Sequence, residues 1–268
     1  HFYADLYPRE GKYGHFAAFD LGIGHANPDG TYRNTFAAMV GNWPRGTAGK
    51  PALLSHDDVE TFFHEFGHIM HQTLTRAKYA SLAGTNVRRD YVEAPSQVLE
   101  NWVWDPVILK RISKHYQTGE PLPDALLDKM VAAKHVNEGI YTSRQLLFAT
   151  ADYRYHSSGS KVDTTATWNQ LSQAVMQVPA VPGTHSQASF GHLMGGYDSG
   201  YYGYLWSKVF AQDMFTRFEK EGLTSSQVGA EYRKRILEPG GVAEPDVLIR
   251  DFLGREPSKE AFYRELGL

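Results

Sequence analysis

Residues Thr61–Met70 read TFFHEFGHIM and contain the pattern H-E-x-x-H, with His64 and His68 four residues apart. In a helix, two residues at this spacing lie one turn apart on the same face. Two imidazoles on one face can hold a single divalent metal ion, and Glu65 beside them can act as a general base. The pattern therefore predicts zinc-assisted hydrolysis, most often of a peptide bond.

The residues around the pattern favour a helix over 56–76. Ser55-x-x-Asp58 is a capping-box signature, and the acidic residues that follow suit the start of a helix. Apolar residues then recur with helical spacing through the histidine pair. Gly67 lies within this helix although a glycine costs a helix about 1 kcal/mol. We therefore expect that a small residue is needed there, so that another backbone or the substrate can approach the metal. The competing interpretation is a helix whose polar face merely carries two His.

A catalytic zinc site needs a third protein ligand and keeps a fourth position open. Two carboxylates, Glu93 and Glu100, follow in the segment 84–104 and would share a face of one helix. Pro95 suits the first turn of that helix. Either carboxylate could bind the metal, and the other could then contact one of the ligands. Each could instead be a solvated side chain on the helix surface.

Three segments together resemble the thimet oligopeptidase family of zinc peptidases. They are HEFGHIMHQ at 64–72, SLAGTN at 81–86 and DYVEAPSQ at 90–97. The resemblance implies that Glu93 is the third ligand and that each chain binds one Zn²⁺. It extends along nearly the whole chain, but it matches only the C-terminal part of the family's longer members. Their N-terminal part forms the opposite wall of a deep channel that admits short, unstructured peptides.

A second cluster, residues 190–204, is rich in Gly and carries one His and four Tyr. This composition is typical of a loop, where functional groups are often placed, or of a Tyr-rich turn packed on the core. The resemblance implies that the loop faces the zinc and that three of its side chains contact the substrate or the oxyanion. These are His192, Tyr197 and Tyr204, with Tyr201, Gly195 and Gly196 as further substrate contacts.

The chemistry that follows assigns one role to each group. Glu65 takes a proton from the zinc-bound water and returns it to the leaving amine. Tyr204 or Tyr197 donates a hydrogen bond to the oxyanion, with His192 as a further donor. Each zinc-binding imidazole also needs a hydrogen-bond acceptor for the ring N–H that does not face the metal. The candidates are Glu100, Gln97 and Ser96.

Two further side chains have both a functional and an ordinary interpretation. His71 lies seven residues beyond His64 and could support the metal site, but a satisfied, partly buried His is the simpler interpretation. Arg89 could hold a substrate carboxylate or pair with Asp90.

Composition limits the class of protein and its partners. The chain has 42% apolar residues, a net charge of −3 and no Cys. It has no basic stripe and no long apolar run, so we expect neither nucleic acid nor membrane as a partner. A chain without Cys suits a cytoplasmic protein, although a periplasmic or secreted one can also lack Cys. The expected partners are short peptides and the N-terminal part of the same protein; the sequence predicts no oligomeric state.

The predicted fold is a single, mainly α, zincin-like catalytic domain with a small β-sheet near the N-terminus. Residues 1–54 form the β-rich segment, in which 35–40 is the edge strand that aligns the substrate. Residues 55–268 form the helical body. Helical patterns cover 56–76, 94–118, 122–157, 164–178, 203–221, 224–237 and a broken 244–266. The predicted function is an oligopeptidase of endopeptidase type; the alternatives are a dipeptidyl carboxypeptidase and a zinc-containing, peptide-binding fragment with little turnover.

Overall fold

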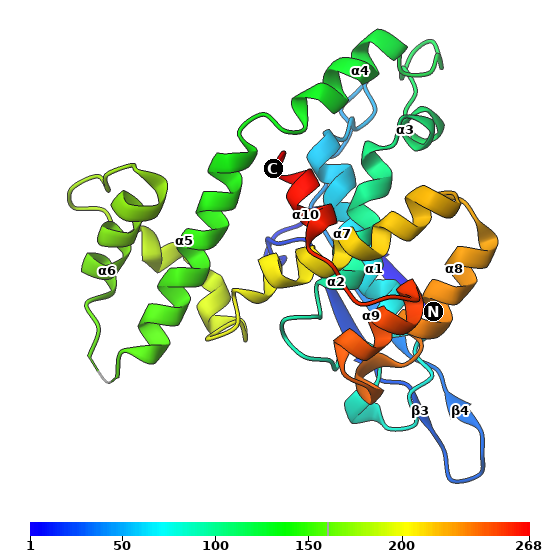
Figure 1. Cartoon of the computed structure of the whole chain (residues 1–268). Helices are drawn as coiled ribbons and strands as arrows, with labels where there is room; N and C mark the ends of the chain where they lie inside the picture. The colour runs from blue at the N-terminus through cyan, green and yellow to red at the C-terminus, as the bar shows by residue number, and fades with distance from the viewer. Residues whose placement is uncertain (160) are drawn as a thin grey trace.

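A computed structural model describes residues 1–159 and 161–268, in which a small sheet precedes a helical body (Figure 1). The fold is mainly α, as predicted. The strands are β1 Phe2–Asp5, β2 Ala17–Gly22, β3 His25–Ala26, β4 Tyr32–Arg33 and β5 Phe36–Val40. The α-helices are α1 His56–Leu74, α2 Ala94–Glu100, α3 Pro106–Ile112, α4 Asp124–Ala133, α5 Glu138–Ser157, α6 Thr164–Leu171, α7 Gly203–Glu221, α8 Ser226–Tyr232, α9 Pro245–Leu253 and α10 Glu260–Glu265. Within the described residues, none of these helices is long and apolar enough to cross a bilayer.

The main sheet has the strand order β1-β5-β2. β5 pairs in parallel with β1 and antiparallel with β2. The prediction that 35–40 is an edge strand is therefore wrong, since both of its edges are occupied. Ala37 and Met39 have no exposed surface and pack against Ile69 of α1, which explains why this run is the most apolar of the three strands. β2 is an outer strand of this sheet, and it contacts α1.

Helix α1 begins where the capping box predicts. The Ser55 hydroxyl accepts a hydrogen bond from the Asp58 amide, and the Asp58 carboxylate accepts one from the Ser55 amide. Both bonds satisfy amides that have no partner within the helix. The helix then presents Phe62, Phe66 and Ile69 to the sheet and its two histidines to the opposite partner, α2.

The contact between α1 and α2 depends on Gly67. A Cβ atom at this position would lie 2.5 Å from Ser96 Cα and 2.9 Å from the Pro95 carbonyl oxygen. Such distances are too short for carbon atoms, so a larger residue would push the two helices apart. The expectation that a small residue admits another backbone is correct, and that backbone is the first turn of α2.

Three predicted helices are shorter than expected, each for a different local reason. The predicted 94–118 helix ends at Glu100, and α3 starts anew with Asp105 as its cap and a proline in its first turn. The 122–157 helix is interrupted before Asn137, which has a left-handed φ of 66°. The 164–178 helix ends at Leu171 and continues as a π turn over 172–176.

Two predictions nearer the C-terminus have different outcomes. The helix predicted over 224–237 begins later, because its cap is Ser225, whose hydroxyl accepts a hydrogen bond from the Val228 amide. The expected break within 244–266 is confirmed, because Gly254 ends α9 in the left-handed conformation.

The apolar interior has a main core and a satellite. The main core lies between α2, α7, α8 and α9 and includes Met214, Ile236 and Phe252. The satellite joins α5 and α6 to residues 190–201 through Leu147, Trp168 and other side chains. Figure 1 shows α5 and α6 as an arm beside the body, from which the chain returns to α7.

We predict that Gly67→Ala lowers the free energy of unfolding by about 1–3 kcal/mol, because the added methyl group meets the α2 backbone. Urea unfolding measures the change. The control is Gly229→Ala in α8, where a Cβ meets no atom within 4 Å; helix propensity there predicts a gain of roughly 0.5–1 kcal/mol. Equal stability of Gly67→Ala and the wild type would contradict the close contact.

Candidate metal centre and active site

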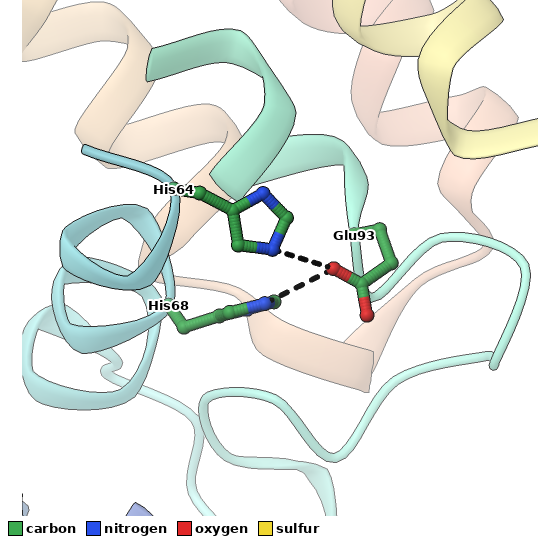
Figure 2. Close-up of side chains that lie close together, drawn as sticks. All are labelled: His64, His68 and Glu93. Carbon is green, nitrogen blue, oxygen red and sulfur yellow. Dashed lines mark hydrogen bonds and ion pairs between the residues drawn. The ribbon is translucent and has the colours of Figure 1, made fainter. Parts of the chain in front are cut away.

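The two histidines of α1 converge on one carboxylate oxygen (Figure 2). His64 Nε2 and His68 Nε2 each lie 3.1 Å from Glu93 Oε2. Glu93 precedes α2 and is only 3% exposed. The Ser96 hydroxyl donates to the Glu93 carbonyl at 2.8 Å, which fixes the turn that carries the carboxylate.

This donor set fits a small divalent metal ion. The three ligand atoms all lie within 4.8 Å of one another. Tetrahedral ligands held about 2.0–2.2 Å from zinc lie roughly 3.4 Å apart, close to the spacing seen here. Two imidazoles and one carboxylate leave a fourth position open, as catalytic zinc sites require.

Glu100, the second carboxylate considered in the sequence, lies behind His64. Its Oε1 is 2.6 Å from His64 Nδ1, and its Oε2 accepts a bond of 2.8 Å from Lys208 Nζ of α7. Glu93 and Glu100 therefore contact opposite nitrogens of the same ring. A carboxylate on Nδ1 fixes the tautomer that directs the Nε2 lone pair towards a metal.

Charges within this cluster hold both carboxylates ionised. Burial would raise the pKa of Glu100, but Lys208 and His64 outweigh burial and lower that pKa to about 2. Burial likewise opposes ionisation of Glu93, yet His68 and His64 keep its pKa well below the usual value. The two imidazoles thus keep Glu93 anionic, and a metal ion bound here would replace the proton that lies between each Nε2 and Glu93.

Glu65 follows His64 in α1 and is 9% exposed. Burial raises its pKa, while His64, His68 and the backbone amide of Ala18 in β2 act in the opposite direction. A buried carboxylate with a raised pKa is a better proton acceptor than an exposed one. β2 therefore lies beside the candidate base.

The tyrosine-rich loop, residues 190–204, reaches the same site. The Tyr197 hydroxyl donates to Glu93 Oε1, and the Tyr204 ring stacks on the Tyr197 ring with centroids 4.9 Å apart. The His192 ring meets these two rings edge-on at 5.8 and 5.7 Å. The structure thus brings His192, Tyr197 and Tyr204 together beside Glu93.

Burial determines the protonation of these groups. It raises the pKa values of Tyr197 and Tyr204, and the Glu93 charge adds to the effect. Burial also lowers the pKa of His192. Both phenols therefore keep their protons at neutral pH and can donate hydrogen bonds, while the imidazole is held towards its neutral form.

The remaining candidates divide between this site and other contacts. The ring of Tyr201 faces the site, but its hydroxyl donates to Gln145 Oε1 at 3.0 Å. Gln97 donates to the Tyr204 carbonyl at 3.1 Å, so it joins α2 to α7 and does not support a histidine.

His71 is fully buried, and within the described residues neither of its ring nitrogens has a partner. Burial lowers the pKa of His71 to about 3.

Arg89 lies against the tyrosine-rich loop. Its guanidinium is 4.7 Å from the centre of the Tyr197 ring, and a Cβ at Gly196 would lie 3.6 Å from its Nη2. Among the described residues it forms no ion pair, so the suggested pairing with Asp90 is not seen. Gly196 has φ +85°, and Gly195 precedes it in the same turn.

A cavity of about 700 Å³ opens beside His64. His64, Glu65 and Gln97 line it on one side, and His192, Tyr201 and Tyr204 line it on another. Sequence reasoning did not single out Lys208, which also lines this cavity. A single Lys in an amphipathic helix carries no signal of its own, and its partner Glu100 is 108 residues away.

We predict that Lys208→Met weakens zinc binding roughly 10-fold, because the Glu100 carboxylate loses the cation that holds it ionised behind His64. Competition with a chromogenic chelator measures the dissociation constant. Lys220→Met, at an exposed position of the same helix, is the matched control and should bind zinc as the wild type does. An unchanged dissociation constant in a folded Lys208→Met chain would show that the pair is only structural.

Comparisons with known proteins agree with this arrangement. The sequence pattern of Peptidase family M3 matches residues 1–268. A thimet-like oligopeptidase of Dictyostelium discoideum is 41% identical over 272 residues, covering 100% of this chain and 40% of that protein. Saccharolysin of Saccharomyces cerevisiae is 43% identical over 273 residues, covering 99% of this chain and 38% of that protein.

The fold itself recurs in solved metallopeptidase structures. A carboxypeptidase of Pyrococcus furiosus superposes with a TM-score of 0.62 over 99% of this chain and 53% of that one, at 15% identity. The chain spans about two fifths of the length of the curated relatives, which are matched over 38–40% of their length. By its sequence and by its zincin-like fold, this chain belongs to Peptidase family M3.

Proposed function

We propose that this chain carries the catalytic site of a zinc-dependent oligopeptidase that hydrolyses peptide bonds in short peptides. The observation that supports the proposal most directly is the convergence of His64, His68 and Glu93 next to a buried Glu65. Pure metal storage would need no such carboxylate beside the ligands. The relatives that the chain resembles are named as oligopeptidases, and family membership implies a metal.

We assign the metal as zinc, one per chain, held by His64, His68 and Glu93. Two imidazoles and one glutamate are a frequent donor set of catalytic zinc in peptidases. When bound, zinc supplies a Lewis acid and lowers the pKa of a coordinated water towards neutrality. Glu100 and Lys208 support this site by keeping the His64 ring in one orientation.

Glu65 acts as the general base and then as the general acid. Its carboxylate takes a proton from the attacking water and passes it to the amine that leaves. General acid–base catalysis typically contributes 10²–10⁴-fold to the rate. The raised pKa of Glu65 brings it nearer to that of the group it deprotonates.

The phenols of Tyr197 and Tyr204 donate hydrogen bonds to the carbonyl oxygen as it gains negative charge. Removing such a donor costs about 3–4 kcal/mol in the barrier. Tyr197 donates to Glu93 in the peptide-free chain, so it must exchange this partner for the substrate. The stacked Tyr204 and the adjacent His192 are the other donors at the same face.

We assign the substrate-aligning role to β2, in place of 35–40. β2 is an outer strand of the sheet, and its Ala18 amide approaches Glu65. An extended peptide that adds to this strand would lie across the site with its backbone hydrogen-bonded. Within the described residues the Arg89 guanidinium forms no ion pair, and it lies against the Tyr197 ring and Gly196. We assign Arg89 and the turn at Gly195 and Gly196 to contacts with the peptide.

The length of peptide accepted depends on residues beyond this chain. Because the relatives are more than twice as long, we infer that an N-terminal part completes the channel and restricts entry to short peptides. Cleavage within a peptide and removal of C-terminal dipeptides give different product masses, and these masses distinguish the endopeptidase from the carboxydipeptidase.

The test compares two substitutions at the site, an isosteric one at Glu65 and a truncation at Glu93. We predict that Glu65→Gln keeps one zinc per chain but lowers hydrolysis of a quenched fluorescent peptide roughly 10²–10⁴-fold. Glu93→Ala should instead lose zinc, because it removes a ligand. Zinc content by atomic absorption is measured with each rate. Stoichiometric zinc in Glu93→Ala would refute the ligand set, and full activity of Glu65→Gln would refute the base.

A further inference from the structure

Asp152 of α5 is a buried carboxylate that the proposed chemistry does not use. It is 1% exposed and sits in the satellite core. Its Oδ1 accepts the Ser199 amide at 2.8 Å, and its Oδ2 accepts the Tyr201 amide at 2.9 Å. His156, one turn further along α5, places its Nδ1 2.9 Å from Oδ1. Both oxygens are thus directed at the backbone of the tyrosine-rich loop.

The two amides lie in the part of the loop that orients the catalytic tyrosines. Ser199 and Tyr201 fall between Tyr197, which reaches Glu93, and Tyr204, which stacks on Tyr197. Ser199 has φ +58°, a left-handed conformation that a non-glycine residue rarely adopts. A carboxylate that accepts the amide of this very residue stabilises a backbone conformation that is otherwise unfavourable.

The loop is confined from the other side as well. A Cβ at Gly200 would lie 2.9 Å from Arg89 Cγ, and a Cβ at Gly203 would lie 2.8 Å from the Arg89 carbonyl oxygen. The turn therefore passes closely over Arg89 and is also hydrogen-bonded to Asp152. Loss of either contact would leave the loop with more than one accessible conformation.

We propose that Asp152 is a positioning residue: it holds residues 197–204 in the conformation that sets the Tyr197 and Tyr204 phenols against the metal ligands. The inference deepens the proposed function and rests on it for the catalytic consequence. A carboxylate is needed because it presents two acceptors. In Asp152→Asn the amide group has one acceptor, and its NH₂ faces a backbone N–H.

The first test is hydrogen exchange, which does not depend on turnover. In the wild type, the amides of Ser199 and Tyr201 should exchange on the order of 100-fold more slowly than exposed loop amides. In Asp152→Asn, exchange of peptides covering 197–204 should rise at least about tenfold, with zinc content unchanged because the ligands lie on α1 and α2. If these amides are unprotected in the wild type, or if exchange is unchanged in the variant, Asp152 does not hold the loop and the proposal is wrong.

The second test separates positioning from mere stability. Asp152→Asn should lower kcat roughly 10–100-fold at an unchanged zinc content, because misplaced phenols act in the transition state. The control is Asp213→Asn, a buried Asp that accepts the Ser258 amide and binds Arg255 away from the site. It should lower the melting temperature and leave kcat unchanged. Faster loop exchange with a wild-type kcat would reduce Asp152 to a structural anchor and overturn the proposal.

If the wild-type chain shows no turnover, the proposed function fails for this chain and the exchange result still decides the anchor. The dissociation constant for the same quenched peptide then replaces kcat. Asp152→Asn should raise it about tenfold, and an unchanged value would overturn the positioning role.

Discussion

The Glu93 carboxylate between two imidazoles is the interaction on which the site depends, and it exists because two helices touch at a glycine. Gly67 lets the first turn of α2 lie against α1, which places Glu93 opposite His64 and His68. The sheet holds α1 from its other side through Ile69, and α7 and α9 hold α2 through the main core. The scaffold therefore brings the side chains of the candidate metal site together.

Around these ligands, the cavity walls come from parts of the chain that are far apart. Lys208 lies in α7, Glu100 ends α2, and the tyrosine-rich loop is held by the α5 arm. Each contributes charge or hydrogen-bond donors at a different point of the site. Lys208 binds the Glu100 carboxylate that contacts His64 Nδ1, and the phenols lie beside Glu93. Electrostatic groups arranged in advance in this way need little reorganisation when a peptide carbonyl gains charge.

The sequence predicted the parts of this arrangement that depend on local chemistry. The capping box at Ser55 and the helical spacing of the histidines are short-range signals, and both correspond to the structure. The choice between Glu93 and Glu100 could not be made from spacing, because both carboxylates reach His64 from opposite ends of one short helix. The resemblance to a family favours Glu93, whose carboxylate lies 3.1 Å from both histidines, and its role as the third ligand stays a proposal.

Long-range pairing was the main source of error. The apolar run at 35–40 predicts an edge strand, but the strand order is set by β1 and β2, which flank it in space and not in sequence. Helix breaks at Asp105 and Asn137 were missed because capping and a left-handed residue outweighed the apolar periodicity. Asp152 and Lys208 carried no pattern, since each acts through a partner at least 47 residues away.

The most direct measurement is hydrolysis of a quenched fluorescent peptide by the purified chain before chelation, after chelation and after zinc is restored. The account predicts cleavage that the chelator stops and one equivalent of zinc per chain restores. The chelated chain should stay folded, because the sheet holds α1 and the main core holds α2 through apolar contacts. Cleavage that persists in a chain shown to be free of metal would contradict the account at its centre.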